Sequence, residues 1–237
     1  MSLTVEQLAQ RKGKITCSLA AQILGEGQFG SPLVAWAKIT GRATEDISQE
    51  DYVRAGNYLE PVVARWWEDD DPRRRRLVLP NCGTVTHPDH EWLVGTPDRF
   101  IARPEDGKII GIWEGKTANA FALADWEHGA VPLGYMIQLQ LYLEIFNYDL
   151  GAFGALVGGQ RFFAADVKRD REFGQIALDR LHEWYQRHVV QDVQPDPTGR
   201  ACDTRQLLRL HPEDLLDEQF VECLCHSCHS AATGAGE

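Results

Sequence analysis

Two acidic residues and a lysine have the types and spacing for metal-assisted chemistry on phosphate esters. Asp98 lies in GTPDRF, and fifteen residues separate it from Glu114, which precedes Lys116 in the apolar run IIGIWEGK. Side chains two apart on a strand share one face, so Glu114 and Lys116 point the same way. If a neighbouring strand returns Asp98 beside them, the carboxylates form an oxygen site suited to Mg²⁺ or Mn²⁺.

The lysine extends the chemistry that this site could perform. Lys116 can orient or deprotonate a water molecule, and it can neutralise charge on a phosphoryl group under attack. The alternative is an exposed Glu–Lys pair on a strand, worth about 0 to 1 kcal/mol. The Pro-Asp at the earlier position and the strand-like context favour the metal site over the surface pair.

The elements that must position these residues follow from the pattern of apolar residues, Pro and Gly. Residues 75–116 contain β-branched and apolar runs broken by turn residues, which predicts a mostly antiparallel meander. A long helical pattern at 48–71 contains Pro61, which must kink the helix or begin a new segment. Helices are predicted at 16–25, 31–41, 132–149 and 170–190, and a hairpin at 151–167.

The composition suits one folded domain. The chain has 237 residues, 43% of them hydrophobic, and seven Trp, enough for a sizeable core. No apolar run approaches the ~18 to 20 residues that cross a bilayer, and the N-terminus lacks the apolar segment of a signal peptide, so a cytoplasmic protein without a membrane partner is expected. The net charge of −11 does not exclude DNA, because a positive channel can lie on an acidic protein.

Five motif regions in one order resemble the PD-(D/E)xK nucleases, and within them the lambda-exonuclease and YqaJ-like viral recombinase group. The matching pieces cover residues 11 to about 190 and are RKGKITCSLAAQILG with SPLVAWAKITG, GNYLEPVVARWW, GTPDRF, WEGKT and YMIQLQLYL. The resemblance implies an α/β fold with a restriction-endonuclease-like core, in which helices flank a central mixed β-sheet. It also implies Mg²⁺-dependent hydrolysis of DNA, with Mn²⁺ able to substitute.

The resemblance assigns metal and catalytic roles to particular residues. Asp98 and Glu114 resemble the family's metal ligands, with the carbonyl of Gly115 as a backbone ligand, and Lys116 resembles the catalytic lysine. Glu60, in GNYLEP, resembles a helix-borne acid that helps hold the metal or its waters.

Further positions match residues that surround the site or approach DNA. Gln138 resembles a glutamine that lines the site, and Arg11 and Ser18 lie where the family's N-terminal segment approaches the DNA end, with Arg11 a contact for a terminal 5′-phosphate. Two departures are present. Gly115 stands where family members carry a bulky apolar residue, and Cys17 replaces a commoner small residue.

Two charged or metal-ligating stretches lie outside these motifs. Arg73 and Arg75, in DDDPRRRRL, are candidates for phosphate contact, although a solvated turn is equally consistent with the run. The tail has Cys223, Cys225, Cys228, His226 and His229, which could hold Zn²⁺ but lack the two separated ligand pairs of a finger or ribbon. A tail without metal is therefore the preferred interpretation.

The combined prediction is a nuclease domain at residues 1–195 followed by a Cys/His-rich C-terminal extension at 196–237. By resemblance, it is a 5′-to-3′ exonuclease on double-stranded DNA ends that generates single strand for phage-type recombination in a bacterial or phage-infected cell. A trimeric assembly and a single-strand annealing protein as partner are implied in the same way. The alternatives are an endonuclease or repair nuclease of this fold, and a non-catalytic DNA-binding scaffold.

Overall fold

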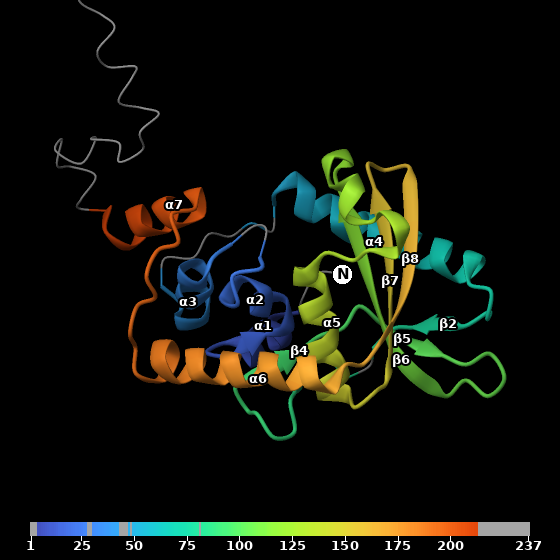
Figure 1. Ribbon diagram of the computed structural model, residues 1–237, viewed down its shortest axis with the longest axis horizontal. Helices are drawn as coiled ribbons and strands as arrows, with labels where there is room; N and C mark the ends of the chain where they lie inside the picture. The colour runs from blue at the N-terminus through green and yellow to red at the C-terminus, as the bar shows by residue number, and fades with distance from the viewer. Residues whose placement is uncertain (1–3, 28–29, 43–46, 48, 81, 213–237) are drawn as a thin grey trace, which may run out of the picture.

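A five-stranded mixed sheet organises the molecule. The computed structural model describes residues 4–212, apart from 28–29, 43–46, 48 and 81. The strands follow the order β2 (Arg76–Val78), β5 (Arg99–Ala102), β6 (Ile109–Ala118), β7 (Leu150–Val157) and β8 (Arg161–Lys168), with β6 and β7 parallel and the other neighbours antiparallel. This confirms the predicted α/β architecture, with helices around a mixed sheet (Figure 1).

The predicted meander over 75–116 is wrong in its connections. β2 pairs directly with β5, while β3 (Val85–Thr86) and β4 (Leu93–Gly95) leave the main sheet and join β1 (Ile15–Thr16) in a small sheet of order β1-β4-β3. The physical reason is burial. All three residues of β4 are buried, and Leu93 and Val94 pair with the buried residues of β1 on one side while β4 keeps β3 as its antiparallel neighbour on the other.

Helices cover both faces of the main sheet. Along β7, Ala152 and Leu156 pack with α4 (Asp51–Asp70), whereas Phe153 and Ala155 belong to the larger core that includes α5 (Leu133–Phe146) and α2 (Cys17–Ile23). This alternation is the period of two expected for a strand buried on both sides. α6 (Arg171–Tyr185) packs against α5, and its end continues into the π-helical segment Gln186–Val190.

The helix boundaries follow local signals in the sequence. α3 (Pro32–Thr40) begins after Ser31, whose hydroxyl accepts a hydrogen bond from Val34 N at 3.2 Å, and ends at Gly41 in the left-handed conformation, φ 72°. α4 runs continuously through Pro61, so of the two predicted alternatives the new segment does not occur and a kink within one helix is left. The remaining elements are α1 (Val5–Arg11), the 3₁₀ turns Ala120–Asp125 and Glu127–Gly129, and α7 (Ala201–Leu210).

The C-terminal part of the described chain is folded onto the N-terminal helices. α7 packs against α3, where Leu207 and Leu210 contact the small core of Leu33, Trp36 and Ala37. Figure 1 shows α7 beside α3 at the end of the molecule away from the main sheet. The Cys/His cluster of the tail, which was weighed as a zinc site, lies outside the described residues. Among the described helices, none has the length and apolarity needed to cross a bilayer.

Candidate active site

The pairing of β5 with β6 brings the two predicted acids together. Arg99 is opposite Trp113 in the antiparallel register, so Asp98, one residue before β5, is placed beside Glu114. The backbone N–H of Gly115 donates a hydrogen bond to Asp98 Oδ2 at 3.0 Å. The expected convergence of Asp98 with Glu114 is therefore present, and it depends on strand register rather than on a loop.

A buried hydrogen-bond network joins Glu114, Lys116 and Gln138. Lys116 Nζ donates to Glu114 Oε1 at 2.8 Å and to Gln138 Oε1 at 3.1 Å, and Gln138 Nε2 donates to Glu114 Oε1 at 2.7 Å. Only 6% of Gln138 is exposed, so its alternative placement toward solvent is excluded. The amide of Gln138 thus orients both charged groups at once.

Two tyrosines of α5 complete this network and were not identified from the sequence. Tyr142 O–H donates to the Thr96 carbonyl at 3.0 Å and accepts from Gln138 Nε2 at 3.1 Å, while the Tyr135 ring centroid lies 4.8 Å from Lys116 Nζ. Tyr135 and Tyr142 are three residues before and four after Gln138, so one face of α5 carries all three. That spacing was the available signal, and it is also the spacing of ordinary core residues.

Burial and like charge control the ionisation of the site. Burial, followed by the charge of Glu114, raises the pKa of Asp98 to about 7. Burial acts to lower the pKa of Lys116, but the negative charges of Glu114 and Asp98 outweigh it, and the pKa of Lys116 is raised. The lysine is therefore held in its protonated form at neutral pH.

The donor set fits a divalent metal ion. Glu114 Oε2 is buried and has no hydrogen-bond partner among the described residues, an orphaned acceptor that a cation would satisfy. Asp98 and Glu114 repel each other, and a cation between them would remove that repulsion. The Gly115 carbonyl is expected on the side of Asp98, since N–H and C=O of one strand residue point the same way. No group of three or more His, Cys, Asp or Glu poised for a metal occurs within the described ranges, so backbone and water would supply the remaining ligands.

Glu60 approaches the acidic pair from helix α4, and, after burial and Glu114, its negative charge contributes to the raised pKa of Asp98. Arg99 donates to both of its carboxylate oxygens, from Nε at 2.7 Å and from Nη2 at 3.2 Å. Glu60 is on α4 and near Gly115, on the face of β6 that also carries Trp113, whereas Glu114 and Lys116 point toward α5. Each oxygen of Glu60 accepts one hydrogen bond from Arg99, and the remaining lone pairs of the carboxylate are left for water or a metal ion. Sequence reasoning missed Arg99 although it adjoins Asp98.

The unusual Gly115 has a packing explanation. A Cβ added to Gly115 would lie 2.7 Å from Trp113 Cη2, and a Cβ on the neighbouring Gly154 would lie 2.8 Å from Trp113 Cζ2. The fully buried Trp113 indole therefore fills the space that, in the PD-(D/E)xK nucleases, a bulky side chain between the Glu and the Lys would occupy. The departure from the motif is compensated by the residue two positions earlier.

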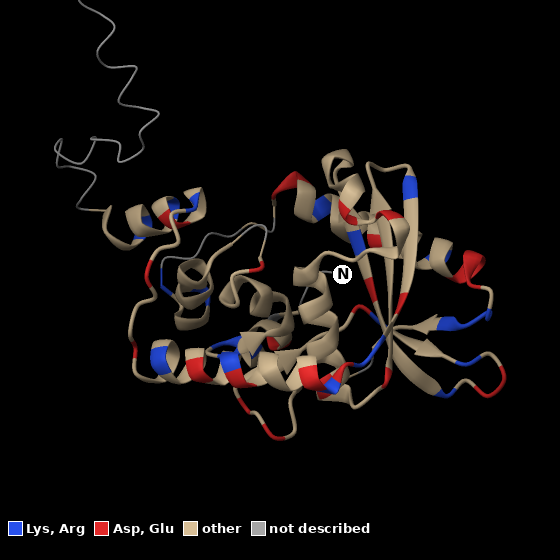
Figure 2. Cartoon of the chain, in the orientation of Figure 1, with Lys and Arg blue, Asp and Glu red and all other residues tan. Residues whose placement is uncertain are grey.

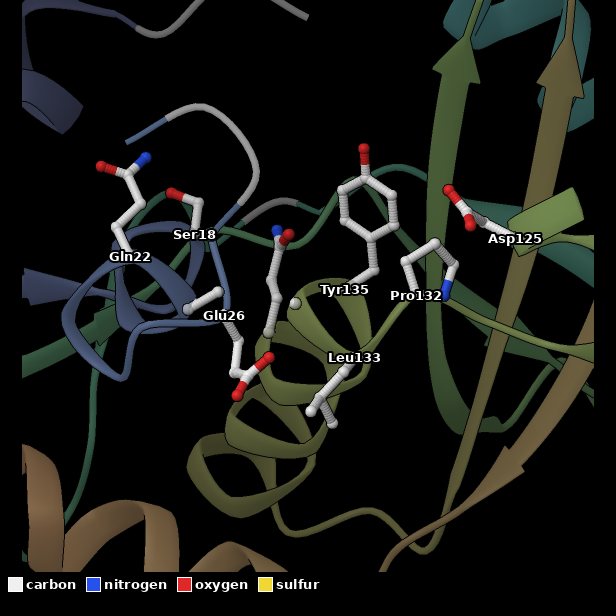
Figure 3. Close-up of a pocket in the computed structure, with 11 residues that line it drawn as sticks. Ser18, Gln22, Glu26, Asp125, Pro132, Leu133 and Tyr135 are labelled. Atoms are coloured by element: carbon white, nitrogen blue, oxygen red, sulfur yellow. The ribbon is translucent and has the colours of Figure 1, made fainter. Parts of the chain in front are cut away.

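A cavity of about 380 Å³ adjoins the network. It is lined by Ser18 and Gln22 of α2, by Glu26, and by Tyr135 and Gln138 of α5. Figure 3 shows Ser18 and Gln22 of α2 on one side of this space and Pro132, Leu133 and Tyr135, at the start of α5, on the other. A second cavity of about 490 Å³ shares Asp125, Pro132 and Tyr135 with the first. The polar site is thus reached between α2, α5 and the 3₁₀ turn Ala120–Asp125.

The predicted DNA-contacting residues fall in different environments. Ser18 is exposed on the cavity wall, and Arg11 Nε is buried without a hydrogen-bond partner in the described part of the chain. Arg73 is exposed and pairs with Asp166. Arg75 is 5% exposed, and its guanidinium binds Asp71 at 2.6 Å and Asp166 at 3.0 Å. The DNA-binding role of Arg75 is therefore corrected to a structural one, because both acids already engage the buried charge.

The charge distribution agrees with anion binding at one local site rather than over a broad positively charged surface. Figure 2 shows acidic and basic residues interspersed along the helices and strands in this view. Near the cavity, Lys116 is held inside the fold, with 15% of its side chain exposed. The protein therefore has a net charge of −11 and, at the same time, the positive charge of Lys116 inside the site.

Comparison with solved structures places the fold among exonucleases. The alkaline exonuclease of Laribacter hongkongensis superposes with a TM-score of 0.60 at 19% identity, over 80% of this chain and 96% of that one. The same enzyme in complex with dAMP gives 0.62 at 18% identity, over 79% and 95%. A phage-related exonuclease of Haemophilus somnus 129PT gives 0.54 at 17% identity, over 76% and 96%.

The family follows from the sequence match. Residues 6–149 match the model of the YqaJ-like viral recombinase domain, more than half of the chain, and the protein belongs to that family. The uncharacterized protein YqaJ of Bacillus subtilis (strain 168) is 27% identical over 210 residues, which are 88% of this chain. The match spans 63% of the length of that relative.

Proposed function

We propose that this protein is a metal-dependent exonuclease that degrades double-stranded DNA from its ends in the 5′-to-3′ direction. The observation that carries the proposal is the buried group of Asp98, Glu114 and Lys116, joined by the Gly115 N–H and by Gln138 beside an open cavity. Solved exonucleases with this fold support the reaction class. By family resemblance, the product would be single-stranded DNA for recombination. The protein would assemble as a ring-shaped trimer, and a single-strand annealing protein would be its partner.

The residues present can divide the work of phosphodiester hydrolysis. A Mg²⁺ ion, with Mn²⁺ able to replace it, would supply Lewis-acid stabilisation of negative charge when held by Asp98, Glu114 and the Gly115 carbonyl. Lys116, kept protonated by its carboxylate neighbours, donates hydrogen bonds and neutralises charge that develops on the phosphoryl group. Gln138 holds the lysine and the glutamate in one geometry.

The cavity offers a route for the DNA end. Ser18 lines its wall, and Arg11, close enough to Cys17 of α2 to affect that thiol electrostatically, would contact a terminal 5′-phosphate. Arg73, which is exposed between α4 and β2, is retained as a contact to the duplex backbone. In this proposal, the contact between Arg11 and the terminal 5′-phosphate determines that digestion runs from the 5′ end.

The test uses linear duplex labelled at either the 5′ or the 3′ terminus, with Mg²⁺ or with chelator. The expected result is metal-dependent release of the 5′ label as mononucleotide, lost in Asp98→Asn. A closed circular duplex separates the alternatives, because an exonuclease leaves it intact and an endonuclease cuts it. If no metal supports degradation of any of these DNAs, the chain is better described as a DNA-binding scaffold.

A further inference from the structure

The segment just before α7 is bonded to a turn that forms part of the wall of the active-site cavity. Arg200 Nη1 donates to the carbonyl oxygens of Gly27 at 2.5 Å and Gly30 at 3.0 Å, and Nη2 donates to that of Gly25 at 3.0 Å. Three carbonyls about 170 residues earlier in the chain thus converge on one guanidinium. Hydrogen bonds to a charged donor are stronger than neutral ones.

The position of Arg200 is itself fixed. The buried carboxylate of Asp203 accepts from Thr198 N at 2.7 Å, from Thr198 Oγ1 at 2.6 Å and from Arg200 N at 3.3 Å, and it also accepts from the hydroxyl of Ser31. Ser31 is the residue that caps α3. The Asp203 network therefore anchors the Arg200 backbone to the start of α3, one residue after Gly30.

On its other side, the same turn presses against the helices of the site. A Cβ added at Gly27 would lie 2.7 Å from Gln22 Cγ of α2, and one added at Gly134 of α5 would lie 3.0 Å from the Glu26 carbonyl oxygen. Glu26 and Gly27 line the cavity together with Gln138. The turn is thus held between Arg200 outside and the α2 and α5 helices inside.

We propose that Arg200 is a positioning residue for substrate entry, holding residues 25–27 at the distance from α5 that sets the width of the cavity. Arg200 does not line the cavity and acts through the carbonyls it binds. The segment that begins at Thr198 is in this way part of the substrate site, although it lies after the predicted nuclease domain. The proposal rests on the proposed exonuclease activity for its kinetic test.

The kinetic test compares Arg200→Ala with Arg200→Lys and with Arg205→Ala, an exposed arginine of α7, on a short 5′-phosphorylated duplex with Mg²⁺. We expect Arg200→Ala to raise KM about fivefold or more with kcat nearly unchanged. Arg200→Lys should restore part of the loss, because it keeps the charge but not the forked donors. Arg205→Ala should behave as wild type, and an equal KM in Arg200→Ala and Arg205→Ala overturns the proposal.

A second measurement does not depend on catalysis. Hydrogen exchange of the Glu26 amide, which donates to the Ala21 carbonyl at 2.8 Å, should be faster in Arg200→Ala than in Arg205→Ala. Unchanged exchange refutes the anchor, whereas absence of DNA degradation by the wild type refutes only the proposed function. If Arg200→Ala does not fold, Gly27→Ala moves the same turn from the side of Gln22 and should raise KM in the same direction, and an unchanged KM there refutes the proposal.

Discussion

At the scale of single residues, the site combines groups whose charges oppose one another. As the proposed metal ligand, Asp98 would bind a cation only when it is deprotonated, and its pKa of about 7 places that step within the neutral range. Below this pKa the proton competes with the metal, so Mg²⁺ affinity should fall by about tenfold per pH unit on acidification. Calorimetric titration with Mg²⁺ from about pH 6 to about pH 8 measures this. The exposed Asp106→Asn is the control, and affinity independent of pH would contradict the assignment.

The raised pKa of Asp98 should also lower the free energy of unfolding of the metal-free protein at neutral and alkaline pH. A folded pKa above the unfolded value means that the folded state binds more protons between the two, so stability falls as pH rises from about 4 to about 7. Asp98→Asn removes this cost and should stabilise the metal-free protein at about pH 8 by roughly 1–3 kcal/mol. Urea unfolding with chelator, at about pH 8 and about pH 5, measures it. Equal effects at both pH values would count against the raised pKa.

Residue types were the part of the site that could be predicted from the sequence. The spacing of Asp98, Glu114 and Lys116 carries information, because strand periodicity and pairing place such residues together. Arg99 and Tyr142 carry no comparable signal. An arginine after an aspartate and a tyrosine on an apolar helix have many structural uses, and only tertiary packing reveals that they hold Glu60 and Gln138.

At the scale of elements, α4 and β5 are joined by the Glu60–Arg99 ion pair. Both side chains are largely buried, so Arg99→Ala leaves a carboxylate without its partner and should destabilise by about 3–5 kcal/mol. Chemical denaturation of both single variants and the double variant gives the coupling energy.

Mg²⁺ titration of Glu60→Gln decides the function of the glutamate. Unchanged Mg²⁺ affinity would mean that Glu60 has a structural role, and a loss of about tenfold would mean that Glu60 helps bind the metal.

The contact of Trp113 with Gly115 gives an element-scale prediction for β6. Gly115→Ala forces a Cβ within 2.7 Å of the indole and should destabilise by about 1–3 kcal/mol. Gly56→Ala in α4 is the control, since its Cβ would meet Thr117 Oγ1 at an ordinary 3.5 Å and alanine favours a helix. Thermal unfolding compares the two. Adding Trp113→Leu to Gly115→Ala should recover part of the loss, and no recovery would refute the steric explanation.

Helices, the hairpin and the pairing of β5 with β6 could be predicted from periodicity, caps and chain order, whereas the pairing of β4 with β1 could not. Ser31, Pro32 and Gly41 mark α3 because each satisfies a local backbone requirement. Pairing of β4 with β1 joins segments nearly eighty residues apart, and no local pattern encodes it. Pro61 illustrates the opposite case, because the local rule allowed a kink or a new segment, and the helix that packs on β6 and β7 continues through the proline as one segment.

At the scale of the whole molecule, the predicted boundary at residue 195 separates parts that contact each other. Truncation after 195 removes Leu207 and Leu210 from Trp36 and leaves Ser31 without Asp203, so we expect a loss of about 2–4 kcal/mol. Truncation after 212 keeps these contacts and removes the Cys/His tail. Its thermal midpoint should therefore be higher than that of the truncation after 195. Equal midpoints for the two truncations would show that α7 is dispensable for folding and that the predicted boundary is right.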